Sequence, residues 1–229
     1  MKVNLNDLNY IVISHGHLDH TWGLVALVKF YTEAKIKKVN HLKPTLVSHP
    51  SSFLTKEFKG LKQIGSIISR EELGRHFKMN LSKVPLWLTR KLVFLGEIER
   101  KNSFETKNSI GKVIEGNFKA DDYLIDDSAL AYKTSEGLVI ITGCSHSGIC
   151  NIIEYAKKIC KDDRIIDIVG GLHLLNPKKE QLQGTLEYME KLHPKEVHAC
   201  HCTDLKSKIA LSRIVNLKEV GVGQILKYK

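Results

Sequence analysis

Apolar and polar positions alternate along the chain in a way that predicts short strands separated by helices. The β-branched run at residues 10–14 and the apolar runs at 45–48 and 92–95 are typical of strands. Residues 21–35 repeat apolar side chains at i, i+3, i+4 and i+7, which indicates a helix. Residues 51–88 are only weakly periodic, so we expect one or two short helices and irregular structure there.

The second half of the chain follows a more regular order. Residues 128–132 and 137–142 predict a hairpin. The elements expected after it are a helix at 149–159, a strand at 165–169, a helix at 179–192, a strand at 196–199, a last helix and a short terminal strand. Strands that alternate with helices in this way indicate an α/β layered fold. No internal repeat or low-complexity linker is visible, which favours a single domain over residues 1–229, with residues 51–125 as an irregular insertion that walls the site.

Composition places the chain among globular proteins. Hydrophobic residues make up 42% and charged residues 26%, which excludes a disordered or collagen-like chain. The longest apolar runs, such as residues 138–141, are strand-sized and far short of the roughly 20 residues that span a bilayer. The first residues lack the apolar core of a secretory signal. We therefore expect a soluble, cytoplasmic protein with no membrane partner.

Charge and cysteine usage narrow the chemistry. The formal net charge of +10 favours anionic partners such as phosphorylated metabolites, nucleic acid or acidic lipid head groups. Because the lysines are scattered and never form a long basic run, a general compositional bias explains the charge equally well. The chain has five cysteines, and Cys144, Cys200 and Cys202 sit beside histidines rather than at disulfide-like spacings. In a cytosolic protein this pattern indicates metal or reactive-site chemistry before disulfides.

Histidines gather in the turns that follow four of the predicted strands. The turns carry His15, His17 and His20; His146; His173; and His201. α/β proteins place ligand sites at such strand ends, and imidazoles and carboxylates are the usual ligands of zinc, iron and manganese. One such histidine is more often structural, but four turns together, one with the spacing His-x-His-x-Asp-His, predict a metal site. Alternate residues of an extended turn point to one side, so His15 and His17 can hold one ion while Asp19 and His20 turn toward a second.

The hexapeptide at residues 15–20, HGHLDH, closely resembles the signature of the metallo-β-lactamase superfamily. The fold of that superfamily is an αββα sandwich with a dinuclear metal centre. Three further stretches, at residues 138–148, 169–174 and 201–203, resemble the subgroup named for 7,8-dihydropterin-6-methyl-4-(β-D-ribofuranosyl)-aminobenzene-5′-phosphate synthase. The resemblance extends over about residues 8–218 and implies the αββα fold for this chain.

The resemblance also implies a ligand set and two catalytic residues. One ion would be held by His15, His17 and His146, and the other by Asp19, His20 and His201. The ions would be divalent, with zinc expected first and iron or manganese as alternatives. Asp19 would also orient the attacking nucleophile, and His173 would be a ligand or a donor to developing negative charge. Ser145 and Thr203 would orient ligand histidines, and Cys144 stands where other members carry a bridging aspartate, as a soft ligand or a small buried residue.

The chain departs from the family pattern at its start. Members usually begin with β-hairpins that contain an Asp-Thr-Gly turn, whereas only fourteen residues precede His15 here. Losing those strands would expose a sheet edge, and an exposed edge is a route to pairing with another chain. We therefore expect an αββα sandwich without its N-terminal hairpins, and a homo-oligomer or a partner chain that covers the edge.

The expected function is a dinuclear-metal-dependent hydrolase or transferase that acts on a small, anionic, phosphorylated substrate, of pterin type if the subgroup is a guide. A nucleic-acid phosphodiesterase is disfavoured because only 7% of the residues are aromatic and no RNA-binding insertion is visible. A di-iron redox enzyme would usually carry a flavin module, for which no glycine-rich loop is seen. A truncated, non-catalytic metal-binding remnant is the remaining alternative.

Overall fold

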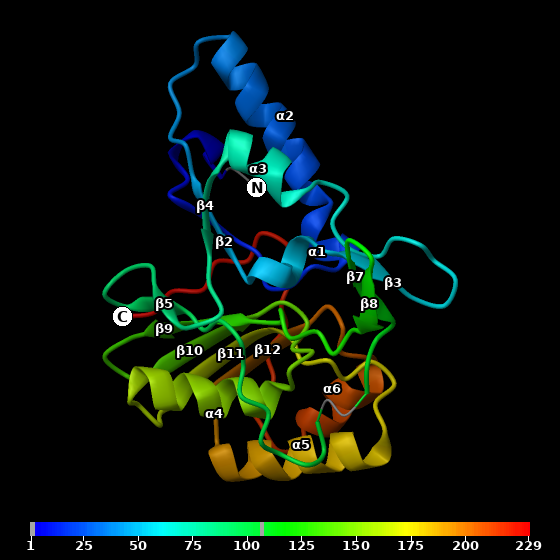
Figure 1. The fold of residues 1–229 in the computed structure, drawn as a ribbon. Coiled ribbons are helices and arrows are strands. Elements are labelled where there is room, and N and C mark those ends of the chain that lie inside the picture. Colours follow the sequence, from blue (N-terminus) through cyan, green and yellow to red (C-terminus); the bar gives the residue numbers. More distant parts are fainter. Residues whose placement is uncertain (1–2, 106–107) are drawn as a thin grey trace. The chain divides into compact units, whose positions relative to one another are not determined.

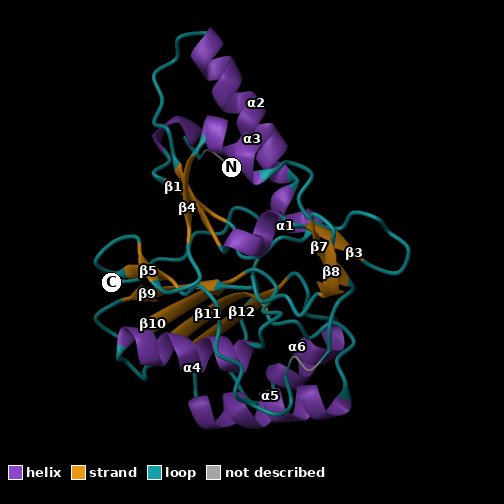
Figure 2. Ribbon diagram, in the orientation of Figure 1, coloured by secondary structure: helices purple, strands orange, loops and turns teal. Residues whose placement is uncertain are grey.

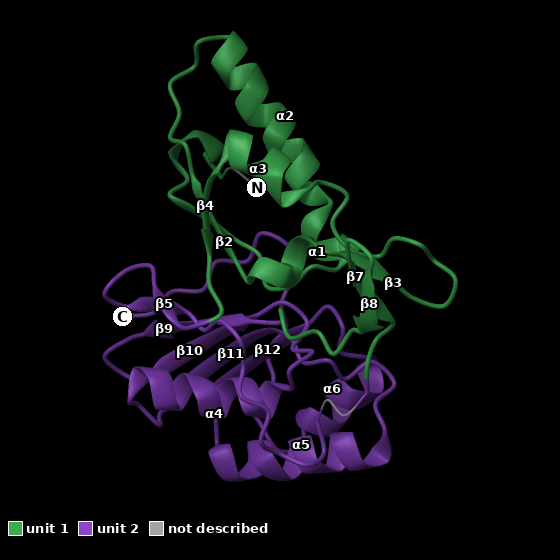
Figure 3. Ribbon diagram, viewed as in Figure 1, with its two compact units in different colours: residues 1–83, 109–126 green, residues 84–108, 127–229 purple. Residues whose placement is uncertain are grey.

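The computed structural model describes residues 3–105 and 108–229. The chain divides into two compact units, each built from two separate stretches of sequence (Figure 3). Unit 1 comprises residues 1–83 and 109–126, and unit 2 comprises residues 84–108 and 127–229. The expectation of one domain over residues 1–229 stays a prediction.

Three parallel strands form the first sheet of unit 1, in the order β1-β2-β4. Figure 1 labels β2 and β4, and Figure 2 labels β1. They are β1 (Tyr10–Val12), β2 (Thr45–Ser48) and β4 (Lys78–Leu81). Parallel neighbours need a crossover, which α2 (Gly23–Ile36) provides between β1 and β2 and α3 (Arg70–His76) provides between β2 and β4. The buried core of this unit contains Ile13, Leu24, Tyr31, Leu46, Leu73 and Phe77.

Short helical turns and a second sheet complete the described part of unit 1. The turns are η1 (Leu5–Asp7), α1 (Leu18–Thr21) and η2 (Pro50–Phe53). The second sheet is antiparallel, in the order β3-β7-β8, with strands β3 (Thr55–Glu57), β7 (Lys112–Glu115) and β8 (Phe118–Asp121). It joins the two sequence stretches of the unit, because Lys56 of β3 lies opposite Val113 of β7.

A six-stranded sheet organises unit 2, in the order β12-β11-β10-β9-β6-β5. The strands are β5 (Leu86–Trp87), β6 (Leu92–Phe94), β9 (Ala129–Lys133), β10 (Leu138–Thr142), β11 (Ile165–Gly171) and β12 (Glu196–Cys200). The last three run parallel and the others antiparallel. The helices are α4 (Ile149–Cys160), α5 (Lys179–Leu192) and α6 (Leu205–Leu211), and α4 and α5 cover one face of the sheet (Figure 2). Ile140, Ile152, Ile168, Met189 and Val197 belong to the core between them.

Most expected elements are confirmed. The helix expected at 179–192 is α5, and the predicted hairpin is β9 and β10. The weakly periodic stretch 51–88 contains one α-helix, α3, together with short strands. The short terminal strand is wrong: after α6 the chain makes only an isolated bridge between Leu217 and Val197. Across residues 3–105 and 108–229, no helix combines the length and the apolar character needed to cross a membrane.

Candidate metal centre

The histidine-rich turn of unit 1 follows directly from β1. The Ile13 amide donates to the Val47 carbonyl at 2.9 Å, so the parallel pairing with β2 continues one residue beyond the strand. The chain then leaves the sheet, and His17 is the N-cap residue of α1. The Leu18 amide donates to the Ile64 carbonyl at 2.8 Å and fixes the start of that helix. The turn between β1 and α1 is therefore short and is held at both ends, which keeps its side chains close together.

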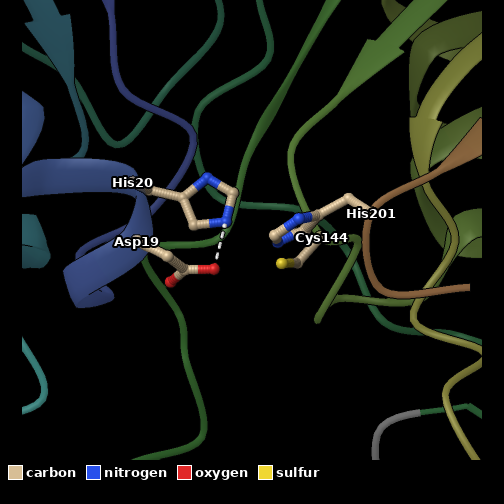
Figure 4. A group of neighbouring side chains, drawn as sticks. All are labelled: Asp19, His20, Cys144 and His201. Atoms are coloured by element: carbon tan, nitrogen blue, oxygen red, sulfur yellow. Dashed lines mark ion pairs between the residues drawn. The ribbon is translucent and has the colours of Figure 1, made fainter. Parts of the chain in front are cut away.

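Four predicted ligands lie together in this turn, and we call His15, His17, Asp19 and His20 the unit 1 cluster. His15 Nε2 lies 3.2 Å from His17 Nδ1, and the rings of His15 and His20 have centroids 4.1 Å apart. A carboxylate oxygen of Asp19 lies 3.4 Å from His20 Nε2 (Figure 4). His15 is fully buried, whereas Asp19 is 45% exposed. The cluster therefore combines one buried imidazole, two partly buried imidazoles and a carboxylate that solvent can reach.

A buried ion-pair network holds the turn in place. The backbone N–H of Gly16 donates to Asp126 Oδ2 at 2.7 Å. Lys56 Nζ donates to Asp126 Oδ1 at 2.9 Å and to Asp122 Oδ2 at 2.7 Å, and all three side chains are at most 4% exposed. A Cβ at position 16 would lie 2.3 Å from the Ser52 carbonyl oxygen, so only glycine fits there. The network fixes the backbone between His15 and His17.

Burial and charge together shift three pKa values in this network. Burial alone would raise the pKa of the Asp126 carboxyl, but Lys56 and the Gly16 N–H together lower it below its usual value. Burial alone would lower the pKa of Lys56, but its two carboxylates raise it overall. Burial, and then the charge of Lys56, lower the pKa of His17. A neutral imidazole is the form that binds metal, so these shifts favour the binding state of His17.

Three turns of unit 2 carry the remaining predicted residues. His146 follows β10, His173 follows β11 and His201 follows β12. The rings of His146 and His173 have centroids 4.4 Å apart. The Cys144 sulfur lies within 4.8 Å of a ring nitrogen of His146 and of a ring nitrogen of His201, and Figure 4 draws Cys144 and His201. We call Cys144, His146, His173 and His201 the unit 2 cluster.

Hydrogen bonds hold the unit 2 turns to one another. Ser145 Oγ donates to the Gly171 carbonyl at 2.6 Å, and the Leu172 amide donates to Thr203 Oγ1 at 3.0 Å. Both hydroxyls thus act on the backbone just before His173. The Ser147 amide donates to Asp127 Oδ2 at 2.8 Å and anchors the turn that carries His146. Ser145 and Thr203 therefore position the histidine-bearing turns, through main-chain atoms.

Each of the same three turns contains a non-glycine residue in the left-handed conformation. Ser145, His173 and His201 have φ values of 63°, 53° and 50°. A left-handed conformation costs a non-glycine residue about 1–3 kcal/mol, and such residues gather at functional sites. By contrast, Lys161 and His193 adopt this conformation as the C-cap residues of α4 and α5, where it is ordinary. The strain supports a functional role for the unit 2 turns.

The donor chemistry of both clusters fits a divalent transition metal. The unit 1 cluster offers three imidazoles and one carboxylate, and the unit 2 cluster offers three imidazoles and one thiol. Sequence reasoning missed Lys56, Asp122 and Asp126, because no local motif links them to Gly16. It interpreted His198 as structural, and the structure buries His198 with Nδ1 2.9 Å from Asp167 Oδ1.

The fold and these donors agree with what comparison with known proteins finds. Residues 1–157 match the metallo-beta-lactamase superfamily, and the chain belongs to that superfamily. The predicted fold class is confirmed, because a crystal structure of Tm1679, described as a metal-dependent hydrolase of the beta-lactamase superfamily, aligns with a TM-score of 0.79. That alignment covers 95% of this chain and 79% of the other, at 24% sequence identity.

Among curated proteins, the chain is similar to a 7,8-dihydropterin-6-methyl-4-(beta-D-ribofuranosyl)-aminobenzene-5'-phosphate synthase of Methanocaldococcus jannaschii. The two are 32% identical over 241 residues, which is 100% of this chain and 78% of the relative. An uncharacterized protein of the same organism is 29% identical over 95% of this chain and 78% of its own length. The predicted resemblance to the superfamily and to the synthase subgroup is confirmed.

Proposed function

We propose that the chain is a dinuclear-metal-dependent hydrolase or transferase that acts on a small phosphorylated substrate, of pterin type. The observation that carries the proposal is the unit 1 cluster, in which three imidazoles and a carboxylate converge on a turn held by the buried Gly16–Asp126–Lys56 network. The similarity to a dihydropterin synthase supports the substrate class. The net charge of +10 suits an anionic substrate.

The ligand sets are those that the superfamily resemblance implies. His15, His17 and His146 would hold one ion, and Asp19, His20 and His201 the other. When bound, divalent ions would lower the pKa of water and would neutralise the negative charge of a phosphoryl or pyrophosphate group. We expect zinc first, with iron or manganese as alternatives. The thiol of Cys144 gives the unit 2 cluster a soft donor where related proteins carry an aspartate.

Two residues of the chain act on protons and charge in the proposed reaction. The exposed carboxylate of Asp19 accepts the proton of the attacking nucleophile and orients its oxygen. The imidazole of His173 follows two glycines, whose backbone a substrate can approach closely, and donates to the negative charge that develops on the leaving group. The hydroxyls of Ser145 and Thr203 keep that imidazole's turn in place.

Metal content tests the proposal directly. Protein purified without chelator or a metal-binding tag should contain about two zinc, iron or manganese ions per chain by elemental analysis. His17→Ala should lower that number to about one or less, because a three-donor site loses a ligand. His193→Asn is the matched control, since it removes an imidazole outside both clusters at a left-handed position that asparagine tolerates. One ion or none in the wild-type protein would refute the two-metal site.

Substrate tests separate hydrolysis from transfer. The metal-loaded protein is given a phosphomonoester, a phosphodiester, or a dihydropterin pyrophosphate with and without an aminobenzene acceptor. Release of pyrophosphate only when the acceptor is present would establish transfer, whereas acceptor-independent release of phosphate or pyrophosphate would establish hydrolysis. His173→Ala should lower kcat with little change in metal content if His173 acts on the leaving group. Loss of metal in His173→Ala would instead assign it as a ligand.

A further inference from the structure

Unit 1 contains a pocket that lies away from its histidine cluster. Its volume is about 470 Å³, within the range of small-molecule sites. The last turns of α2 and α3 and the segment 41–44 line it. In unit 1, α2 and α3 lie side by side (Figure 1). The segment 41–44 leads into the amino-terminal end of β2, whereas the histidine turn follows the carboxyl-terminal end of β1.

The lining is cationic. Lys35, Lys43 and Arg75 contribute three permanent positive charges, His41 and His76 contribute imidazoles, and none of the described residues that line the pocket has a carboxylate. Glu72, outside the lining, lies 3.2 Å from Arg75 Nη1 and 3.3 Å from His76 Nε2. One carboxylate therefore partly offsets three cations, and a positive excess remains.

Lys35 and Lys43 differ from the neighbouring lysines in their ion pairing. Lys29 and Lys37 also lie on or next to α2, outside the pocket, and both pair with Glu33, at 3.8 and 3.4 Å. Among the described residues, Lys35 and Lys43 have no ion-pair partner. Lys35 is in the last turn of α2, where a cation offsets the helix dipole, but Lys43 lies outside both helices and has no such role. Dipole compensation therefore does not account for the charge of this pocket.

An aromatic side chain forms one wall. Tyr31 is only 5% exposed, and its ring centroid lies 5.6 Å from that of His41 and 5.9 Å from that of Phe77. Its hydroxyl donates to the Leu5 carbonyl at 2.6 Å. Tyr31 thus offers the pocket part of its ring rather than its hydroxyl. The pocket combines cations that suit phosphoryl oxygens with an aromatic wall that suits an organic group.

We propose that this pocket is a binding site for a small organic phosphate, separate from the metal centre. Lys35 and Lys43 hold the phosphoryl oxygens, and the Tyr31 and His41 rings contact the organic part. Lysine ammonium groups are mobile point charges that bind phosphate without the fixed geometry of arginine. The site needs no metal, because lysine ammonium groups bind phosphoryl oxygens directly, so it does not depend on the proposed catalytic function.

Calorimetric titration of the full chain with phenylphosphonate tests this site. The probe carries a dianionic phosphoryl group on an aromatic ring, and its C–P bond is not a phosphoester. Benzenesulfonate has the same ring with one negative charge less, and should bind at least about tenfold more weakly. Lys35→Gln with Lys43→Gln should weaken phenylphosphonate binding by about tenfold or more. The matched control, Lys29→Gln with Lys37→Gln, removes two charges from outside the pocket and should change binding by less than about twofold.

His17→Ala separates this site from the metal centre. If the probe binds in the pocket, His17→Ala leaves its affinity unchanged, whatever happens to the metal content. Loss of binding in His17→Ala would place the probe at the metal centre and overturn the proposal. Equal weakening in both double-lysine variants would show a general charge effect, and would overturn it too. So would an absence of binding to the wild-type protein. Thermal melting of each variant confirms that the exposed substitutions leave the fold intact.

Discussion

Gly16 has no side chain, yet the geometry of the histidine turn depends on it. Its backbone N–H is bound by Asp126, and the Ser52 carbonyl occupies the space where a Cβ would stand. The buried His15 and the partly buried His17 flank this glycine in the sequence. Any residue larger than glycine must therefore move the backbone that aims His15 and His17.

Gly16→Ala should therefore lose metal together with stability. Overpacking of this kind costs about 1–3 kcal/mol of the free energy of unfolding. Urea unfolding and elemental analysis measure the two effects. Gly23→Ala is the control, because nothing lies within 4 Å of its added Cβ and it begins α2; its stability should stay equal or rise by up to about 1 kcal/mol. Full metal content in Gly16→Ala would show that the turn adapts.

Asp126 should make the free energy of unfolding depend on pH in the acidic range. Its folded pKa is below the ordinary value of 3.8, so its contribution is fully present above pH 3.8 and is lost as the pH falls through the lowered folded value. Asp126→Asn removes this contribution and keeps the side-chain shape. The variant should be less stable than wild type by about 1.5–3 kcal/mol at pH 7, the size of a hydrogen bond to a charged group. Urea unfolding at pH 3 to 7 should show this difference shrinking at the acid end; a constant difference would contradict the assignment.

At the scale of elements, periodic segments with many local contacts were predictable from the sequence. α5 spans Lys179–Leu192, the range that its apolar spacing predicts, and α4 ends one residue beyond its expected end. The helix expected at 21–35 begins earlier, because α1 starts at Leu18 and is continued by α2 after Trp22. The sheet β3-β7-β8 was not predictable, because its strands mix charged and apolar residues and β3 pairs with β7 across a long stretch of sequence.

The edge strand of the parallel sheet is where a second copy of the chain could pair. β1 ends the order β1-β2-β4. Asn9 O accepts from the Thr45 amide and the Ile13 amide donates to Val47 O, both at 2.9 Å. Since alternate residues of a strand face the same neighbour, the backbone of Val12 points away from β2. A second copy of the chain could pair at this edge, which is how the expected homo-oligomer would form.

Val12→Pro tests that pairing without breaking the β1–β2 ladder. Proline removes the N–H at position 12, which faces away from β2, and proline is tolerated at sheet edges. Light scattering after size-exclusion chromatography should find the wild-type protein as a dimer and Val12→Pro as a monomer. A monomeric wild-type protein, or a dimer that survives the substitution, would exclude edge pairing by β1.

At the scale of the molecule, the sequence located the histidine-bearing turns but not the residues that hold them in place. The six-residue motif at 15–20 and the three later turns are short and local, so each predicted donor could be recognised from the residues next to it in the sequence. Lys56 and Asp126 gave no such signal, because a buried lysine looks like any surface lysine until the fold pairs it. The division into two units was also hidden, since each unit takes residues from both sides of the other.

The bond between Gly16 and Asp126 spans 110 residues, and that separation sets an order of events during synthesis. At about 5–20 residues per second, Asp126 is made about 5–22 seconds after Gly16. From its own synthesis until residue 122 is made, Lys56 has neither carboxylate to pair with, and its burial would be costly. The histidines of the first turn therefore leave the ribosome early but gain their fixed geometry late, so ions that meet the nascent chain find flexible donors rather than a formed site.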